Sequence, residues 1–588
     1  MRLRPLALPL LLLVPLACGP ATSSAPPAAA MMPPSSTTSF SAFTGRFLRA
    51  YLERFPTEAT ALGEHAYDAR WPDLSAAGDA ATLAFLAASR AELRTFAPAS
   101  LTEDERVDAS VLGNALDRME FELREQKPAE LVPRTYANVI GDGLDPLVTR
   151  EFAPLEVRMK SLEGRLQGIP GVVAVAKQRL GRPPRINTET AIEQVRGLVG
   201  LCDHDLPELF AKVPAQQASL EAARGPALAA LKDLLAFLQD VVLPRSDGDF
   251  RAGRERFTKT LRFQCDDPAL DPDALERDAR ATMHETQEQM LATALELWPT
   301  LMPGPRPHPT TDADRKAAIR AVLDKLAEDR LDDATIVPEA QRLLADATEF
   351  VRTHDLMTLP VEPCSVIVMP EYKRGFAVAY CEASGPFEAH PLTFVALSPP
   401  PADWPAERRL SQYREYNRSM LADLLVHEGM PGHYLQLMHK NHFKSDVRAV
   451  FDDGAFVEGW AVYGEWLMAK YGFGGPKVHL EQLKMLLRVA TNTVLDHAIH
   501  AGTMDEKEAL ALMEGEAFQE EGEAVKKWRR ARISQGQLST YFYGFRELMK
   551  LRREAEARPG FTEHAYNDRV LAFGSPPIRA LRGEMGLP

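Results

Sequence analysis

Apolar side chains recur at helical spacing through the first half of the chain. Residues 40–55 carry one such stripe, which consists of Phe43, Phe47, Leu48, Tyr51 and Leu52. Pro56 follows it as a stop signal. Segments rich in Ala, Leu, Glu and Arg, without strict alternation, continue to about residue 300. We therefore predict helix after helix over this half, with breaks at Pro146, residues 168–171, residues 181–184 and Pro207.

The pattern changes after residue 300. The Pro- and Gly-rich stretch 303–309 predicts a loop and a subdomain boundary, and an apolar face over residues 340–351 predicts another helix. Three short segments rich in Val, Phe and Tyr then predict strands of a small antiparallel sheet. They are residues 365–369, 376–381 and 392–397. Helical patterns resume near residue 410 and run to the end.

These elements predict a mainly α fold: a large multi-helix protein with a small antiparallel β-sheet and a deep cleft between helical lobes. The sheet is expected beside the helix near residue 421, which carries the candidate active site described below. A chain of 588 residues is too long to fold around one simple hydrophobic core, so two or more lobes are expected. The predicted division is a signal peptide over residues 1–17, a lipid-attachment site and tether over 18–38, a helical scaffold lobe over 39–302, and a catalytic lobe over 303–588.

The charge balance narrows the classes of partner. The formal net charge is −14, from 68 basic and 82 acidic residues. Proteins that bind nucleic acid present a basic face, so we expect no nucleic-acid partner. The negative net charge does not argue against a peptide substrate.

The N-terminus has the pattern of a targeting segment. Arg2 and Arg4 precede an apolar run over residues 6–16, which is too short to span a bilayer as a mature helix. Residues 19–38 are rich in Ala, Pro, Ser and Thr, as in a flexible tether. The mature protein is therefore expected outside the cytoplasm.

The end of the apolar run resembles a bacterial lipoprotein cleavage site, with Cys18 as the acylated residue. Pro15 and Leu16 depart from the usual pattern, and simple secretion is the alternative. The expected location is the cell envelope, either lipid-anchored to a membrane through Cys18 or periplasmic or secreted.

The other cysteines are scattered along the chain, without a C-x-x-C pair. They are Cys202, Cys265, Cys364 and Cys381. This spacing argues against a disulfide framework and against a cysteine zinc site. An isolated disulfide between Cys364 and Cys381 stays open in an oxidising compartment.

Residues 421–436 carry the candidate chemistry. Two histidines, His427 and His433, flank a short turn, with Glu428 directly after the first. Neutral imidazoles are good zinc ligands, and a neighbouring carboxylate can take a proton from metal-bound water. Six residues of ideal helix would place the two rings about 120° apart. Pro431 and Gly432 predict a break that brings His433 back toward the metal.

A zinc site with one open position needs a third protein ligand. Glu458 and Glu465 lie seven residues apart, among Trp, Val and Ala, where a carboxylate is costly unless it is paired or binds a metal. We predict Glu458 as the ligand and Glu465 as the carboxylate that orients a ligand histidine. Two exposed acids on an amphipathic helix are the alternative, and the two glutamates could exchange roles.

The segment from His427 to Gln436 resembles the His-Glu-x-x-Pro-Gly-His-x-x-Gln signature of a widespread bacterial family, long known as a domain of unknown function and often described as lipoproteins. The resemblance covers nearly the whole mature chain. It includes 457–465, 496–500, 535–544 and 574–576, with Ala498 in place of Gly and Gln535 in place of Pro.

That family is similar in arrangement to gluzincin-type zinc metallopeptidases. The resemblance implies His427, His433 and Glu458 as Zn²⁺ ligands and Glu428 as the general base of peptide-bond hydrolysis. Strands beside the zinc helix would bind the substrate by edge addition. No nucleophile elbow or phosphate-binding loop supports a serine hydrolase or a nucleotide enzyme.

Further residues are candidates for supporting roles. His500 and Tyr541 could donate a hydrogen bond to the oxyanion, and the alternative for each is a packed helical residue. Gln436 could support a ligand or lie on a helix surface. His439 and His442 are expected on a solvated face, away from the metal.

The sequence predicts a zinc-dependent hydrolase that cleaves peptide bonds, with oligopeptides as substrates. Two alternatives stay open. The same centre could cleave another amide or an ester, or the protein could be a non-catalytic peptide-binding envelope lipoprotein. The presence of Glu428, which is not a ligand, argues against the second.

Overall fold

The computed structural model describes residues 39–369, 378–389, 391–401 and 404–587. The predicted signal peptide, Cys18 and the tether lie outside these residues, as does the beginning of the second predicted strand. Residues 40–588 form one compact unit. The proposed division at residue 302 therefore stays a prediction.

The first half is helical, as predicted. Its first helix, α1 (Phe40–Arg54), buries all five residues of the predicted stripe together with Phe40. The helices that follow are α2 (Pro56–Ala61), α3 (Ala76–Leu93), α4 (Glu103–Phe121), α5 (Pro128–Leu131), α6 (Arg134–Thr149), α7 (Leu155–Arg179), α8 (Arg185–Gly200), α9 (Leu206–Phe210), α10 (Gln217–Phe237), α11 (Arg254–Gln264) and α12 (Pro272–Leu301).

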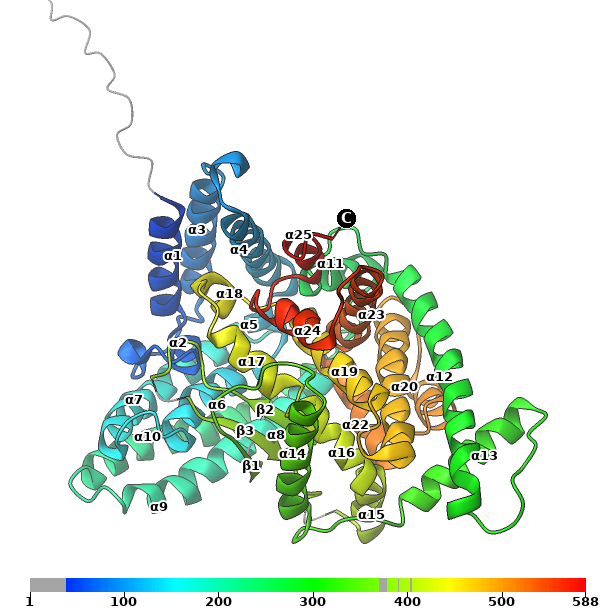
Figure 1. The fold of residues 1–588 in the computed structure, drawn as a ribbon. Helices are drawn as coiled ribbons and strands as arrows, with labels where there is room; N and C mark the ends of the chain where they lie inside the picture. Colours follow the sequence, from blue (N-terminus) through cyan, green and yellow to red (C-terminus); the bar gives the residue numbers. More distant parts are fainter. Residues whose placement is uncertain (1–38, 370–377, 390, 402–403, 588) are drawn as a thin grey trace, which may run out of the picture. The chain divides into compact units, whose positions relative to one another are not determined.

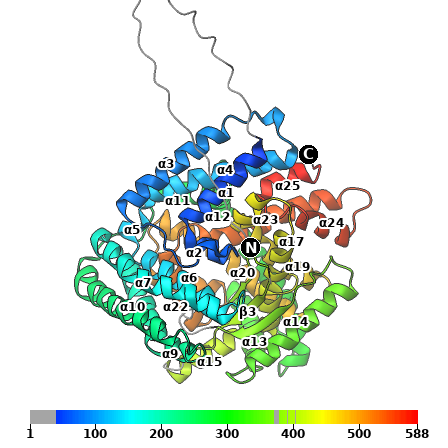
Figure 2. The ribbon, with the colours of Figure 1, turned by 90° about the vertical axis from the view of Figure 1, so that its left-hand side faces the viewer.

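Two of the predicted breaks are wrong, because Pro146 lies inside α6 and Pro170 inside α7. Pro207 lies in the first turn of α9, which follows α8 after a π-helical turn over Leu201–Asp205. Residues 181–184, in contrast, separate α7 from α8. Helices α6, α7 and α10 pack side by side around one apolar cluster (Figures 1 and 2). This packing outweighs the local cost of a proline within a helix.

The second half continues with helices on either side of a small sheet. They are α13 (Asp312–Leu326), α14 (Ile336–Thr353), α15 (Ala406–Glu415), α16 (Arg418–Glu428), α17 (His433–Asn441), α18 (Asp446–Val450), α19 (Gly454–Lys470), α20 (Gly475–His500), α21 (Glu506–Ala511), α22 (Glu521–Ile533), α23 (Gln537–Glu556), α24 (Glu563–Leu571) and α25 (Ile578–Glu584). The loop predicted at 303–309 joins α12 to α13, and α14 contains the helix predicted over 340–351.

The sheet is mixed rather than antiparallel. Strands β1 (Cys364–Val368), β2 (Ala379–Glu382) and β3 (Thr393–Leu397) have the order β1-β3-β2, with β3 parallel to β1 and antiparallel to β2. Residue patterns locate short strands, but they do not reveal which strand enters the middle. The sheet contacts α14 through β1, and it contacts α16 and α17 through β2. It therefore lies beside the predicted active-site helix, as expected.

The sheet order rules out the disulfide that the sequence left open. Cys364 on β1 and Cys381 on β2 are separated by β3 and are free thiols. Neighbouring strands are about 4.8 Å apart, so two Cα atoms on opposite sides of β3 lie about 10 Å apart. Disulfides need Cα atoms within about 7 Å.

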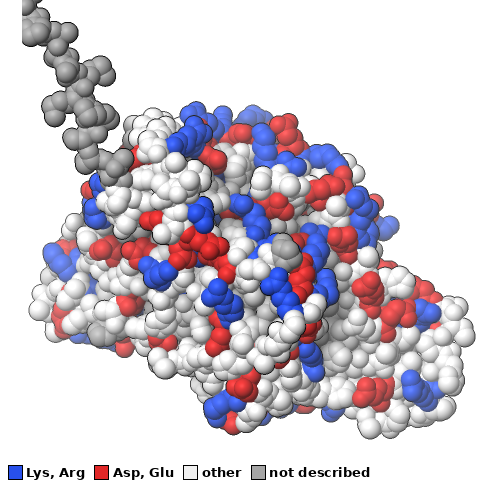
Figure 3. Space-filling model, turned by 45° about the horizontal axis from the view of Figure 1, so that its top comes forward, with Lys and Arg blue, Asp and Glu red and all other residues white. Residues whose placement is uncertain are grey.

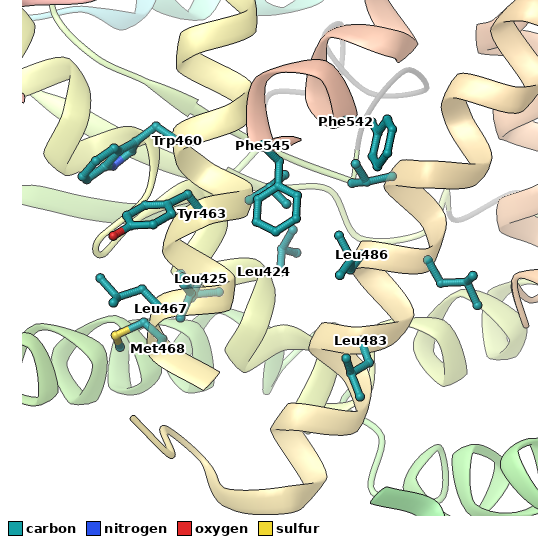
Figure 4. Packing of buried hydrophobic residues seen from close by; sticks show 14 of the residues in the cluster. Leu424, Leu425, Trp460, Tyr463, Leu467, Met468, Leu483, Leu486, Phe542 and Phe545 are labelled. Carbon is teal, nitrogen blue, oxygen red and sulfur yellow. The ribbon is translucent and has the colours of Figure 1, made fainter. Parts of the chain in front are cut away.

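The main core is formed by α16, α19, α20 and α23, which pack against one another. Figure 4 shows Leu425 of α16 near Leu467 and Met468 of α19, and Leu424 of α16 near Phe545 of α23. The same apolar cluster extends to α12, which packs along α20. Within the described residues, no helix is long and apolar enough to cross a membrane. Basic and acidic side chains are interspersed on the face shown in Figure 3.

Candidate metal centre

The N-terminus of α16 is fixed by a hydrogen-bonded cap. The Asn417 side chain accepts hydrogen bonds from the backbone N–H groups of Ser419 and Met420. Its amide group donates to Glu481 of α20 at 2.7 Å. Such a cap satisfies donors that have no partner inside the helix. Every residue from Met420 to Glu428 is buried, so α16 is held along its whole length.

The predicted break between the two histidines is confirmed. Helix α16 ends at Glu428 and α17 begins at His433. The turn folds back tightly, since the Gly432 N–H donates to the Val426 carbonyl at 2.9 Å. A Cβ atom on Gly432 would lie 1.9 Å from the carbonyl oxygen of His427, so glycine is required there. Trp460 of α19 fixes the turn by donating to the Pro431 carbonyl at 2.9 Å.

Helix α19 crosses α23 at two glycines. A Cβ atom on Gly459 would lie 2.4 Å from the Gly544 backbone, and one on Gly544 would lie 1.9 Å from the Ala455 carbonyl oxygen. The two backbones therefore meet directly. This crossing places Glu458, next to Gly459, and Tyr541, about one turn before Gly544, at the same site.

The structure brings the three predicted ligands together. One ligand atom each from His427, His433 and Glu458 lies within 4.8 Å of the others. The Glu458 Oε2 atom is 3.7 Å from His427 Nε2 and 3.4 Å from His433 Nε2. In a tetrahedral zinc site with bonds of about 2.0–2.2 Å, ligand atoms are about 3.3 Å apart. The spacing therefore fits one zinc ion between them.

Glu465 orients His427, as predicted. Its Oε1 atom is 2.6 Å from His427 Nδ1, and its side chain is fully buried. When Nδ1–H donates to this carboxylate, Nε2 carries the lone pair that a metal requires. The alternative of two exposed acids on α19 is wrong, because the Glu458 side chain is only 19% exposed.

Two ligand residues carry buried polar atoms without a hydrogen-bond partner among the described residues. They are Glu458 Oε2 and His433 Nδ1. An unsatisfied buried carboxylate oxygen is costly unless it is neutralised or binds a metal. Glu458 Oε2 lies near both imidazole nitrogens, at 3.7 and 3.4 Å, and a donor set of two nitrogens and one oxygen would suit zinc.

The electrostatics of the cluster also favour a cation. Burial opposes charge on His427, yet Glu458 and Glu465 hold the pKa of its ring well above the ordinary value. Burial alone would raise the pKa of Glu458, but His427 and His433 hold it below its usual range. Without a metal the cluster therefore attracts protons, and a metal ion would compete with them.

A cavity of about 660 Å³ adjoins the cluster. His427, Glu428 and Tyr541 line it, together with Val378 and Ala379 at the beginning of β2. Glu428 is 8% exposed and is not part of the ligand triad. The carboxylate expected to act as a base therefore lies in the wall of this cavity, and the deep cleft between two lobes stays a prediction.

Tyr541 also lines the cavity. Its ring stacks on that of His427, with 6.3 Å between centroids. Its hydroxyl oxygen accepts hydrogen bonds from Arg530 at 3.0 Å and from Gln537 at 3.3 Å. These bonds leave the hydroxyl proton available to a group in the cavity. Burial raises the pKa of Tyr541, which keeps it in the neutral, donating form.

His500 is not brought to the cluster. It does not line the cavity among the described residues, and its Nε2 atom lies 2.8 Å from the carbonyl oxygens of both Ala531 and Ser534. The ring therefore joins the ends of α20 and α22. The sequence showed a conspicuous histidine but could not show which way it points, and the packed alternative holds.

The remaining candidates are structural. Gln436 is fully buried and donates to the Ser575 hydroxyl, so it anchors the C-terminal segment and neither supports a ligand nor lies on a surface. His439 bonds to the Thr358 carbonyl, and His442 is exposed beside Glu362. Both lie outside the triad, as predicted.

The same cavity has a basic wall that the sequence alone did not reveal. Helix α22 contributes Lys526, Lys527, Arg529, Arg530 and Arg532 to it. The visible signal was a basic run within an acidic chain. A basic run is usually a solvated surface, and only the fold shows that this one faces the metal cluster.

Comparison with known proteins places this fold among bacterial proteins without an assigned function. The family described as "Bacterial protein of unknown function (DUF885)" matches residues 56–585. A solved structure described as a "putative lipoprotein of unknown function" from Shewanella oneidensis is 32% identical, with a TM-score of 0.78, over 93% of this chain and 100% of that one. A "putative lipoprotein" from Colwellia psychrerythraea is 15% identical, with a TM-score of 0.73, over 93% and 98%, and it supports the fold alone. No match was found among curated proteins.

Proposed function

The chain belongs to the DUF885 family of bacterial proteins of unknown function, as its motifs predicted, and we propose that it is a zinc-dependent hydrolase of peptide bonds. The observation that carries the proposal is the convergence of His427, His433 and Glu458 within 4.8 Å. Glu428, which is not a ligand, lies next to them in the wall of a cavity. This combination of a metal triad and a free carboxylate is what metal-assisted hydrolysis requires.

The protein residues have separate tasks in this proposal. When bound, zinc would lower the pKa of a water molecule and polarise the substrate carbonyl. Glu428 takes a proton from the attacking water and passes it to the leaving amine. The Tyr541 hydroxyl donates a hydrogen bond to the carbonyl oxygen as negative charge develops on it. Glu465 keeps His427 oriented, because its carboxylate fixes the Nδ1 proton.

The cavity favours an extended oligopeptide over a folded protein. Its volume is about 660 Å³, which is in the range of sites that enclose small ligands. Ala379 of the edge strand β2 lines it, so a peptide backbone could add to the sheet beside the metal. The same metal centre could act on another amide or on an ester.

The location follows from the N-terminal sequence and a relative. The Shewanella protein, which is 32% identical over 93% of this chain, is described as a "putative lipoprotein of unknown function". Cys18 follows an apolar run in this chain. We infer that the mature protein is attached to a membrane of the cell envelope through a lipid on Cys18.

The test is peptide profiling with the zinc-loaded protein. We expect mass spectrometry of a peptide mixture to show cleavage by the wild type. Glu428→Gln should retain about one zinc per chain and lose activity by roughly 100-fold or more. Glu285→Gln, which changes an exposed glutamate on α12, is the matched control. Unchanged turnover in Glu428→Gln would refute the assigned role, and cleavage of esters or non-peptide amides alone would favour the rival chemistry.

A further inference from the structure

The wall of the cavity is basic, although the chain as a whole is acidic. The described residues that line it include seven arginines and lysines against four glutamates, in a chain of net charge −14. The basic residues are Arg408, Arg488, Lys526, Lys527, Arg529, Arg530 and Arg532. An excess of one sign of charge in a cavity attracts ligands of the opposite sign.

Several of these cations already have carboxylate partners. Arg488 pairs with Glu523, and Arg529 lies 2.7 Å from Glu193. Arg408 lies 3.5 Å from Glu521. Their charge is therefore largely neutralised by the protein itself.

Among the described residues, four of the seven cations have no carboxylate within hydrogen-bond distance: Lys526, Lys527, Arg530 and Arg532. Of these four, Lys527 and Arg530 are the two on which the field of the Glu458 carboxylate acts. Lys527 is 6% exposed, and its ammonium group is 4.0 Å from the nearest carboxylate oxygen, on Glu523, beyond hydrogen-bond distance. Arg530 donates to two neutral groups, Gln537 and the Tyr541 hydroxyl. Within the part of the chain that the structure describes, neither cation donates a hydrogen bond to a carboxylate.

A buried ammonium group is costly unless a carboxylate neutralises it. The nearest carboxylate to Lys527, on Glu523, is 4.0 Å away and already pairs with Arg488. Burial lowers the pKa of Lys527, and the neighbouring Arg488 and Arg530 lower it further. A carboxylate entering the cavity would give Lys527 a hydrogen-bonded partner of its own, and hydrogen bonds between charged groups are the strong ones.

The same cations are linked to the metal triad. The Arg530 guanidinium is 3.0 Å from the Tyr541 hydroxyl, and the Tyr541 ring stacks on His427. The field of the Glu458 carboxylate acts on both Lys527 and Arg530. A group held by these two side chains therefore lies close to the scissile bond.

We propose that Lys527 and Arg530 bind a carboxylate of the substrate, so that the enzyme prefers peptides with a carboxylate near the bond that is cleaved. This inference rests on the proposed function. The carboxylate comes either from the C-terminus of the peptide or from an Asp or Glu side chain, since both present the same chemistry to the two cations.

The test measures binding rather than turnover. The zinc-loaded Glu428→Gln protein is titrated with three probes by calorimetry: tetra-alanine with a free C-terminus, the same peptide amidated, and an amidated peptide with one Asp. We expect a carboxylate peptide to bind roughly tenfold more tightly than the amide, or better. In a Lys527→Met background this preference should fall to near onefold. Lys527→Arg should retain it, and Lys212→Met, at an exposed position, is the matched control.

The three probes decide between the sources of the carboxylate. Tight binding of the free C-terminus alone indicates an exopeptidase, and tight binding of the amidated Asp peptide indicates an acidic side chain. Equal affinity of the Glu428→Gln protein for all three probes would overturn the inference. So would a carboxylate preference that is fully retained when Lys527→Met is added. Hydrolysis by the wild type without a carboxylate preference would refute only this inference. A carboxylate preference without hydrolysis would refute only the proposed function.

Discussion

At the scale of single residues, His427 is held by two carboxylates with different tasks. Glu465 lies 2.6 Å from Nδ1, where a proton is shared, and Glu458 lies 3.7 Å from Nε2, where there is room for an ion. The shorter contact fixes the tautomer, and the longer one fits ligands of a common metal. The geometry favours Glu458 as the candidate ligand and Glu465 as the carboxylate that orients His427, whereas the sequence left open that the two exchange roles.

Tyr541→Phe isolates the contribution of one hydroxyl. The ring that stacks on His427 is retained, so the zinc content should not change. Loss of one donor to the oxyanion should lower kcat about 10²- to 10³-fold, with little effect on KM. Steady-state kinetics on the best peptide substrate would measure this, with Tyr471→Phe, outside the cavity lining, as the control. Wild-type kcat in Tyr541→Phe would remove the hydroxyl from the mechanism.

Sequence reasoning worked best where chemistry is encoded locally. The spacing of His427 and His433, with Pro431 between them, required a helix break, and the break is present. It failed for His500, because a histidine on a long helix can face either the site or the packed side. Lys527 and Arg530 were missed for a related reason, since α22 meets the metal cluster only through tertiary packing.

At the scale of elements, helix α16, which carries His427 and Glu428, depends on its neighbour α20. Asn417 caps α16 and in turn donates to Glu481 of α20 at 2.7 Å. Burial raises the pKa of Glu481 to about 7, although Lys484 acts in the opposite direction. The pairing of a cap with a buried acid links the stability of α16 to pH.

The pH dependence has a definite sign. The folded-state pKa of Glu481, about 7, lies above the unfolded value of about 4.3. Between these pH values the folded protein therefore binds more protons than the unfolded chain. The stability that protonated Glu481 contributes is lost as the pH rises from about 4.3 to about 7. Glu481→Gln should reduce the fall in the free energy of unfolding between pH 5 and 8.

Urea unfolding at a series of pH values would measure the effect, with the exposed-site variant Glu285→Gln as the control. Parallel pH profiles for the wild type and Glu481→Gln would contradict the assignment. The sequence could not have predicted this link, because Asn417 and Glu481 are 64 residues apart and meet only in the fold.

At the scale of the whole molecule, distant parts of the chain are joined by buried polar contacts as well as by apolar packing. Arg448 of α18 is fully buried and pairs with Asp108 of α4 at 2.7 Å and with Glu584 of α25 at 2.9 Å. The main apolar cluster likewise draws on residues from Ala252 to Leu587, on both sides of the predicted boundary at residue 302.

Helical periodicity predicted the mainly α class of the fold, because helices such as α1 bury a stripe that is visible in the sequence. It could not predict the order β1-β3-β2 of the sheet, which depends on pairing between segments that are not adjacent in the chain. Prolines were also poor guides, since Pro170 lies within the 25-residue helix α7. Tertiary packing decided each of these cases.

We propose above all that the folded chain binds one metal ion at His427, His433 and Glu458. The most direct measurement is the zinc content of purified protein after dialysis against excess zinc and removal of free metal, by elemental mass spectrometry. We predict about one zinc per chain in the wild type, in Glu428→Gln and in His442→Ala, whose histidine is exposed and outside the triad. His433→Ala should retain far less. A wild-type protein without zinc, or full zinc retention in His433→Ala, would contradict the claim.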